Sequence, residues 1–143
     1  MILQKNKSAY FHFEIIKEYE VGIMLIGSEV KSCRNKHIQI KGAFIRIKDG
    51  EMFLKNTHIS RYSYDQNPEY EEDRERKLLL NKNEILRITS KMKSDSLAII
   101  PLSFYTKGPY IKVKIALARG KKKYDKRESI KKRDLNRKLA VHI

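Results

Sequence analysis

The sequence has no tryptophan, only one cysteine and only three prolines in 143 residues. The single cysteine, Cys33, excludes a disulfide within the chain, so we expect a reducing, cytoplasmic setting. Apolar runs are too short to span a bilayer, and the first residues lack the apolar core of a signal peptide. We therefore expect no membrane partner.

The sequence also lacks the ligand spacings and glycine-rich loops of common catalytic sites. No histidine has another His or a Cys at metal-ligand spacing; the four are His12, His37, His58 and His142. Residues 120–122, Gly-Lys-Lys, lack the first glycine and the Ser or Thr of a phosphate-binding loop. Cys33 could act as a nucleophile, but it shares an apolar stripe with Val30, which favours packing. We expect no metal, no cofactor and no enzymatic activity.

Positive charge is what the sequence has in excess. Lysine and arginine number 32 against 17 acids, which gives a net charge of +15. Hydrophobic residues make up 41% of the chain, enough for one folded domain with its own core. The charge excess alone would suit either of two polyanions, nucleic acid or an anionic membrane surface.

The charge is densest in residues 119–143, where eleven Lys or Arg face three acids and leave +8. Tyr124 is the only aromatic residue in this segment. Dense cations repel one another and do not stabilise a fold, whereas cations with a stacking group are typical of segments that bind RNA. A solvated tail is the alternative interpretation.

Strand patterns dominate the rest of the chain. Asp49-Gly50 between two β-rich runs is the strongest hairpin signal. Pro101 interrupts an apolar run and favours an edge or bulged strand. After a polar leader at 1–9, the expected strands cover 10–15, 21–26, 43–48, 51–56, 96–105 and 110–118.

Short helices and one long loop complete the pattern. Ser28 is the expected N-cap of a helix ending near Lys36. Asn81, with Glu84 at the third helical position, begins a second helix that ends near Lys93. The intervening residues 61–77 form a long polar connection, typical of a functional or mobile loop.

Many short strands with two or three short helices predict a mainly β domain, a small OB-like β-barrel, closed or partly open. Closure would remove exposed strand edges. The expected organisation is a barrel over 1–118 and a basic tail over 119–143.

Two further basic groups lie outside the tail. On the first helix, Lys31 and Arg34 share one face. Arg74 and Arg76 alternate, so both point the same way if that segment is extended. Each group suits RNA, and each is equally typical of an ordinary solvated surface.

The tail has weak helical character. Acid-to-base pairs four residues apart and a narrow stripe through Leu135 and Leu139 contribute too little to hold a short helix in water. We expect residues from about Asp125 onward to be disordered when free and helical once RNA neutralises their charge.

Four stretches of the sequence occur in the same order in one known family. They are 27–34 (GSEVKSCR), 56–59 (NTHI), 74–80 (RERKLLL) and 118–127 (ARGKKKYDKR). From Asn6 to about Leu139 the chain resembles the small protein B family, the SsrA-binding proteins of bacterial trans-translation.

The resemblance implies a non-enzymatic adaptor with an OB-like barrel and a C-terminal extension. Such proteins bind the tRNA-like domain of transfer-messenger RNA (tmRNA) and deliver it to ribosomes stalled without a stop codon. The body stands where a tRNA anticodon arm would be, and the tail enters the empty mRNA channel of the small subunit as a helix. A monomer is implied, with elongation factor Tu involved only indirectly, through charged tmRNA.

The resemblance also assigns residues. The tmRNA-binding set is Asn6, Glu20, Glu29, Lys31, Arg34, Lys36, Arg74, Arg76, Lys77, Leu79 and Asn81. The set for the decoding centre and mRNA channel is Gly120, Lys121, Lys122, Lys123, Tyr124, Asp125, Lys126, Arg127, Lys131, Lys132 and Arg133. Tyr124 stands where family members carry an aromatic residue or histidine able to stack on an rRNA base.

The chain departs from the family pattern in a few places. Cys33 replaces a leucine, and Glu71-Glu72 replaces Asn-His. In the tail, Lys132 replaces a glutamate and Leu135 a tryptophan. A leucine forfeits stacking, so we expect weaker tail docking unless the charge of Lys132 compensates.

Two other functions remain open from the residues alone. The first is a generic OB-fold ribosomal or single-stranded RNA-binding protein, which needs aromatic platforms on the barrel. Phe11, Phe13, Phe44 and Phe53 could supply them. The second is an RNA-modifying enzyme, against which the missing cofactor motif and ligand cluster count heavily.

Overall fold

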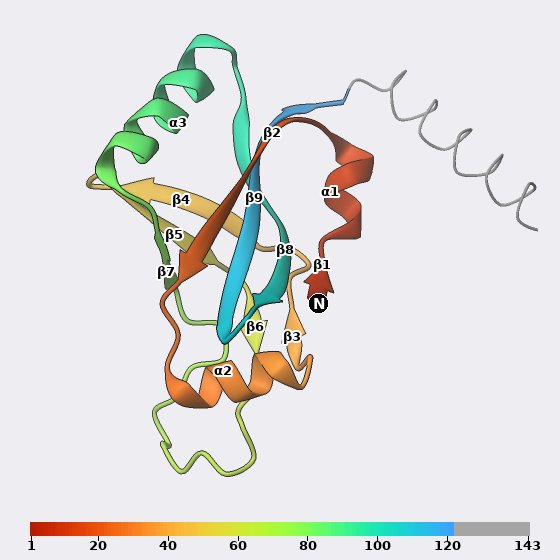
Figure 1. Ribbon diagram of the computed structural model, residues 1–143, viewed down its shortest axis with the longest axis vertical. Coiled ribbons are helices and arrows are strands. Elements are labelled where there is room, and N and C mark those ends of the chain that lie inside the picture. Colours follow the sequence, from red (N-terminus) through yellow and green to blue (C-terminus); the bar gives the residue numbers. More distant parts are fainter. Residues whose placement is uncertain (122–143) are drawn as a thin grey trace, which may run out of the picture.

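The computed structural model describes residues 1–121, which form nine strands and three helices (Figure 1). The strands are β1 (Ile2–Lys5), β2 (Phe13–Ile23), β3 (Ile38–Gln39), β4 (Phe44–Lys48), β5 (Glu51–Lys55), β6 (His58–Ile59), β7 (Arg76–Leu79), β8 (Ala98–Lys107) and β9 (Tyr110–Gly120). The helices are α1 (Lys7–His12), α2 (Gly27–Arg34) and α3 (Lys82–Ser94). None of these helices is long and apolar enough to cross a membrane.

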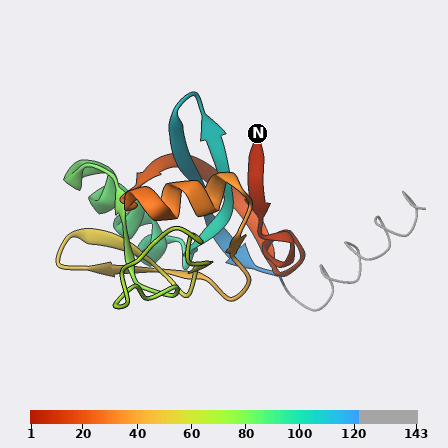
Figure 2. The ribbon, with the colours of Figure 1, turned by 90° about the horizontal axis from the view of Figure 1, so that it is seen from below.

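Seven strands form one antiparallel sheet in the order β1-β8-β9-β2-β7-β5-β4, and β3 pairs with β6 separately. The mainly β prediction is confirmed. The sheet curls so that β4 contacts β8, but β1 and β4 remain as edges. The barrel is therefore the partly open one of the two forms that the sequence pattern allowed. Seen from below, α2 lies across one end of the curled sheet (Figure 2).

The central strands follow their hydrophobic pattern. In β9, Ile111, Val113 and Ile115 are buried while Lys112 and Lys114 are partly exposed, as the alternation predicts. The bulge expected in β8 is also confirmed, because its register with β9 shifts between Pro101 and Ser103. However, β8 is not an edge strand, since β1 covers its other side.

The hairpin of β4 and β5 is confirmed. Asp49 and Gly50 have φ angles of 53° and 73°, so both turn residues are left-handed. This is the turn geometry whose twist matches that of the flanking strands, and it explains the Asp-Gly pair. The strands pair directly from Lys48 with Glu51 onward.

The N-terminal region differs from the prediction. The polar leader at 1–9 and the strand from Tyr10 are wrong, because β1 pairs with β8 and α1 occupies Lys7–His12. The strands expected at 10–15 and 21–26 are largely one long strand, β2, with a register shift between Ile15 and Lys17. Pairing with β9 from Phe13 to Gly22 holds β2 extended through the polar residues between the two patterns.

The helix caps follow local side chains. The expected N-cap Ser28 is wrong: Ile26 is the N-cap of α2, and its backbone N–H donates to the Glu29 carboxylate (3.0 Å). The N-cap Asn81 is confirmed, since its side chain accepts from the Glu84 N–H at 2.8 Å.

The core has two parts. The larger lies on the concave side of the sheet and includes Cys33 from α2 with Ile85 and Ile88 from α3. The smaller lies under α1, where Ala9 packs near Leu102. Cys33 is fully buried, and burial raises the pKa of its thiol to about 12, so packing rather than nucleophilic chemistry explains it.

Strand β9 continues past the expected boundary at residue 118. Gly120 pairs with Phe13, and the Lys121 N–H donates to the His12 carbonyl at 2.9 Å. The body therefore includes the first residues assigned to the tail. The predictions for 122–143 lie outside the described residues.

Replacing Asn81 with alanine should lower the free energy of unfolding by about 1 kcal/mol, because the Glu84 N–H loses its acceptor. Urea unfolding followed by circular dichroism measures this. Asn83→Ala is the matched control, since Asn83 lies on the exposed side of the same turn and caps nothing. Equal losses in both variants would contradict the cap.

Candidate nucleic-acid interface

The centre of the site is a buried carboxylate. Glu29 lies in the first turn of α2, and its side chain has no exposed surface. Arg76 from β7 donates to Glu29 Oε2 from Nε at 2.7 Å, with its Nη2 at 2.6 Å. Arg74 donates to both oxygens of the same carboxylate, from Nε at 3.1 Å and from Nη2. The two arginines do point the same way, as their alternation predicts, but toward Glu29.

The remaining donors of Arg76 tie several segments together. Its Nη1 donates to the carbonyls of Thr57 (2.6 Å) and Arg74 (3.1 Å), and its Nη2 donates to the Glu72 carbonyl (3.0 Å). The Tyr70 hydroxyl, which donates to the Ile59 carbonyl at 2.8 Å, lies 3.3 Å from Nη2. One guanidinium thus joins α2 to Thr57, just before β6, and to the second half of the loop at 60–75.

Electrostatics favour the ionised pair. Burial alone would raise the pKa of Glu29, but the hydrogen bonds from Arg74 and the Ile26 N–H, with the charge of Arg76, outweigh it and hold the pKa below the ordinary value. Burial, together with the nearby Glu29 charge, raises the pKa of Tyr70 to about 12, so its hydroxyl stays a donor.

The other side of α2 faces solvent and is basic. Lys31 Nζ lies 5.1 Å from the centre of the Tyr62 ring, and that ring is 5.4 Å from the ring of Tyr64. Tyr64 is 80% exposed. Arg34 donates to the Pro109 carbonyl (2.7 Å) in the turn between β8 and β9. The surface formed by Lys31, Arg34, Tyr62 and Tyr64 is called the α2 surface below.

The assigned tmRNA-binding residues do not form one patch. Lys36 follows α2 in a left-handed conformation (φ 62°) and is exposed near the α2 surface. Glu20, on β2, pairs with Lys107 of β8 at 2.9 Å. Asn6 lies away from α2 at the start of α1, where its side chain donates to the Pro101 carbonyl (3.0 Å).

The remaining assigned residues run along β7 toward α3. Lys77 pairs with Glu51 at 3.1 Å, and Leu79 is 48% exposed over β2. Leu79 can lie there because a Cβ on Gly22 would come within 3.2 Å of its Cδ1. Asn81 is occupied as the cap of α3.

Glu29 and Arg76, both assigned to the tmRNA-binding set, are buried in the described body, and their side chains join α2 to β7 rather than face solvent. The sequence reading overlooked Tyr62 and Tyr64 as candidates, although the cluster of tyrosines in an otherwise polar loop was a visible signal. Within residues 1–121, no His, Cys, Asp or Glu side chains gather in a way that could hold a metal ion.

In the second assigned set, only the first residues are described. Gly120 ends β9, and Lys121 Nζ donates to the Tyr10 carbonyl at 3.1 Å. The other members, from Lys122 to Arg133, lie outside the described residues.

Comparison with known proteins points to one family. Residues 3–143 match the family described as SmpB protein. The SsrA-binding protein of Mycoplasma mycoides subsp. mycoides SC is 47% identical over 138 residues, covering 96% of this chain and 93% of that protein. The SsrA-binding protein of Syntrophobacter fumaroxidans is 45% identical over 138 residues, covering 96% of this chain and 86% of that protein.

A solved structure is also similar. It is described as "tmRNA-SmpB: a journey to the center of the bacterial ribosome" and matches with a TM-score of 0.67 at 38% identity. The match covers 89% of this chain and 93% of the other. The similarity therefore extends over most of the chain.

Glu29→Gln should lower the free energy of unfolding by about 3 kcal/mol, because it leaves the buried Arg76 charge without an opposite charge beside it. Because the folded pKa of Glu29 is depressed, its contribution is present above the ordinary value of 4.5 and is lost as the pH falls toward the folded pKa. The variant should therefore lose less stability than the parent chain between pH 5 and pH 3.

Urea unfolding at a series of pH values measures both effects. Glu14→Gln is the control, since Glu14 is exposed and lies 3.8 Å from Arg119. A Glu29→Gln chain as stable as the control at pH 7 would show that the buried cluster does not hold the fold.

Proposed function

Because the chain belongs to the SmpB protein family, we propose that it is a tmRNA-binding adaptor of trans-translation, acting on stalled ribosomes. It binds the tRNA-like domain of tmRNA and brings it to ribosomes that lack a stop codon. The protein supplies binding and positioning rather than a chemical step.

The proposal rests on one observation: the buried contacts of Glu29 with Arg74 and Arg76 hold α2 so that the α2 surface faces solvent. With Glu29 and Arg76 satisfied inside, α2 turns Lys31 and Arg34 outward beside an exposed tyrosine. Cations that neutralise phosphates and an aromatic ring that stacks on an unpaired base are the two elements of folded RNA recognition. The net charge of +15 strengthens attraction to RNA at long range.

The finer parts of the proposal concern the tail and the partners. The segment from Gly120 to Arg133 reaches the decoding centre and the mRNA channel of the small subunit, where Tyr124 stacks on rRNA. The chain acts as a monomer in the cytoplasm, and elongation factor Tu meets it only through charged tmRNA. The strongly basic composition of 119–143 and the resemblance of its motif support this assignment.

A generic single-stranded RNA-binding protein is less well supported. That function needs exposed aromatic platforms along the sheet. Of Phe11, Phe13, Phe44 and Phe53, only Phe44 on β4 is exposed. The exposed tyrosines are also scattered: Tyr64 lies in the loop beside α2, Tyr10 on α1 and Tyr110 at the start of β9.

Neutralising Lys31 and Arg34 (Lys31→Gln with Arg34→Gln) should weaken binding of the tRNA-like domain by about tenfold or more. Each lost phosphate contact should also flatten the dependence of log K on log salt by up to about 0.9. Filter binding at several salt concentrations measures both. Lys41→Gln with Arg46→Gln removes the same charges from exposed positions elsewhere and should change affinity far less. Equal losses would place the binding surface elsewhere.

Truncation after Lys121 should separate the two activities. It keeps β9, its pairing with Phe13 and the hydrogen bond to His12, so the body should fold and bind tmRNA almost as before. Peptide tagging on stalled ribosomes should be lost, because the basic segment is gone. A cut after Ala118 is a poorer test, since it also removes a paired part of β9. A chain truncated after Lys121 that still supports tagging would contradict the assignment of the tail.

A further inference from the structure

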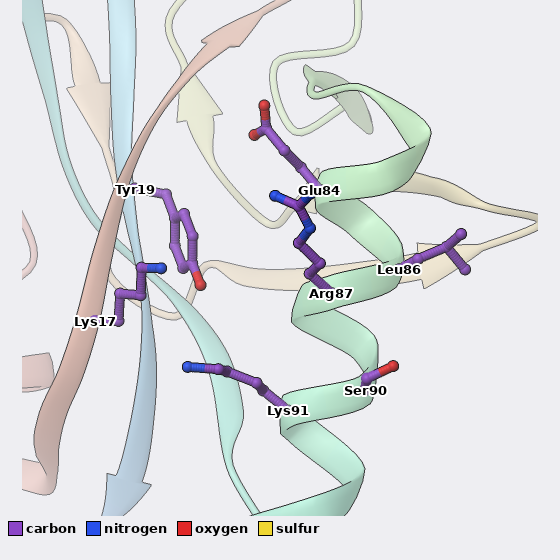
Figure 3. A pocket seen from close by; sticks show the side chains of 7 residues that line it. All are labelled: Lys17, Tyr19, Glu84, Leu86, Arg87, Ser90 and Lys91. Carbon is purple, nitrogen blue, oxygen red and sulfur yellow. The ribbon is translucent and has the colours of Figure 1, made fainter.

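A groove of about 610 Å³ lies between β2 and α3, away from α2 and the loop at 60–75 (Figures 1 and 3). It is lined by Lys17, Tyr19, Glu84, Leu86, Arg87, Ser90 and Lys91. None of these side chains belongs to the sets assigned to tmRNA or to the ribosome. The volume lies within the range of pockets that hold small organic groups, roughly 300–1,000 Å³.

The groove combines an aromatic floor with cations on both walls. Tyr19 points from β2 toward α3, while Arg87 and Lys91 point from α3 back toward β2 (Figure 3). Lys17 Nζ lies 5.2 Å from the centre of the Tyr19 ring. Within residues 1–121, no carboxylate forms an ion pair with any of these three cations. Their charge is therefore available to a ligand.

The single acid of the groove sits at one end. Glu84 accepts from the Asn81 side chain at 3.0 Å, which fixes it near the start of α3. Glu84 lines the same groove as Tyr19, and burial and, second, the charge of Glu84 raise the pKa of the Tyr19 hydroxyl. Glu84, Arg87 and Lys91 follow one another along α3, so an acceptor lies at one end of the groove and the two cations lie along the rest of the α3 side (Figure 3).

We propose that this groove holds one unpaired nucleotide of a bound RNA strand. The base stacks on Tyr19, its phosphate binds Arg87 and Lys91, and an amino group of the base donates to Glu84. Lys17, which now covers the ring, swings aside to a neighbouring phosphate. Base stacking on an aromatic side chain flanked by cations is the usual way proteins hold unpaired nucleotides.

The chemistry favours a strand over other occupants. A free nucleotide is usually held by backbone N–H groups of a glycine-rich loop, and here only long side chains at the rim can reach the phosphate. An acidic peptide would fit the cations but would be repelled by Glu84 and would leave the Tyr19 face without a flat partner. In an RNA strand, the phosphates on either side of the bound nucleotide can make further contacts with these long side chains, which a free nucleotide cannot. The proposal extends beyond the assigned tmRNA-binding residues, because none of them lines this groove, although Asn81 hydrogen-bonds Glu84 at its edge.

Nuclear magnetic resonance of the full chain tests the proposal, with amide shifts followed while a hexamer of adenosine nucleotides is added. We expect saturable shifts at Tyr19, Arg87 and Lys91, read separately from any binding by the tail. Arg87→Gln with Lys91→Gln should weaken the affinity read at Tyr19 by about tenfold. Lys82→Gln with Lys93→Gln, which removes two charges from the same helix outside the groove, should weaken it less than about twofold.

Three results would overturn the proposal. The first is equal weakening in both double variants, since that would reflect general charge attraction. The second is adenosine monophosphate shifting the groove residues while the hexamer does not. The third is a hexaglutamate peptide shifting them as strongly as RNA. The double variant Arg87→Gln with Lys91→Gln should still bind the tRNA-like domain through the α2 surface. Failure of the groove proposal can therefore be distinguished from failure of the proposed function.

Discussion

The buried contact between Glu29 and Arg76 is the interaction on which the arrangement of this domain depends. Both side chains are removed from solvent, which is costly for charged groups unless they are paired and hydrogen-bonded. Here the pair is satisfied by Arg74, by the Ile26 N–H and by the carbonyls of Thr57 and Glu72. Because these partners belong to distant segments, one cluster sets the position of α2, β7 and the loop at 60–75 together.

This constraint explains how a basic chain can present cations selectively. A surface helix with several basic residues has little to fix its position on the sheet. In α2, the Glu29 carboxylate provides that anchor by binding Arg76 of β7. The exposed side of α2 then carries Lys31, supported by the Tyr62 ring, and Arg34, tied to the Pro109 carbonyl. Across the molecule, the groove of Tyr19 and Arg87 offers a second surface of similar chemistry on different elements. A small domain with two such surfaces can hold two parts of one large RNA assembly.

Local signals predicted much of this structure. Asp49-Gly50 predicted its hairpin, Asn81 its helix and the alternation of β9 its buried face, because each depends on neighbours in sequence. The N-terminal strand and α1 were missed because β1 is held by pairing with β8, about a hundred residues away, which no short pattern records. Whether the sheet closes also depends on pairing between strands far apart in sequence, so the sequence could not decide between the closed and the partly open form.

The site shows the same division. The motif around Glu29 and the two arginines was visible in the sequence, and their convergence followed from alternation. Their burial was not visible, because charged residues are usually exposed and only the fold reveals that Arg76 has five acceptors around it. The groove was missed because Tyr19 and Arg87 lie far apart in sequence and meet only when α3 packs beside β2.

The most direct test of the account is the affinity of the Glu29→Gln chain for the tRNA-like domain, measured at low temperature with its folded state verified. Glu29 cannot touch RNA, so any loss must come from the position of α2 and its loop. The account predicts a clear loss of affinity together with faster amide hydrogen exchange in α2 and in 60–75. A folded variant that binds with full affinity would contradict the claim that the buried pair organises the RNA-binding surface.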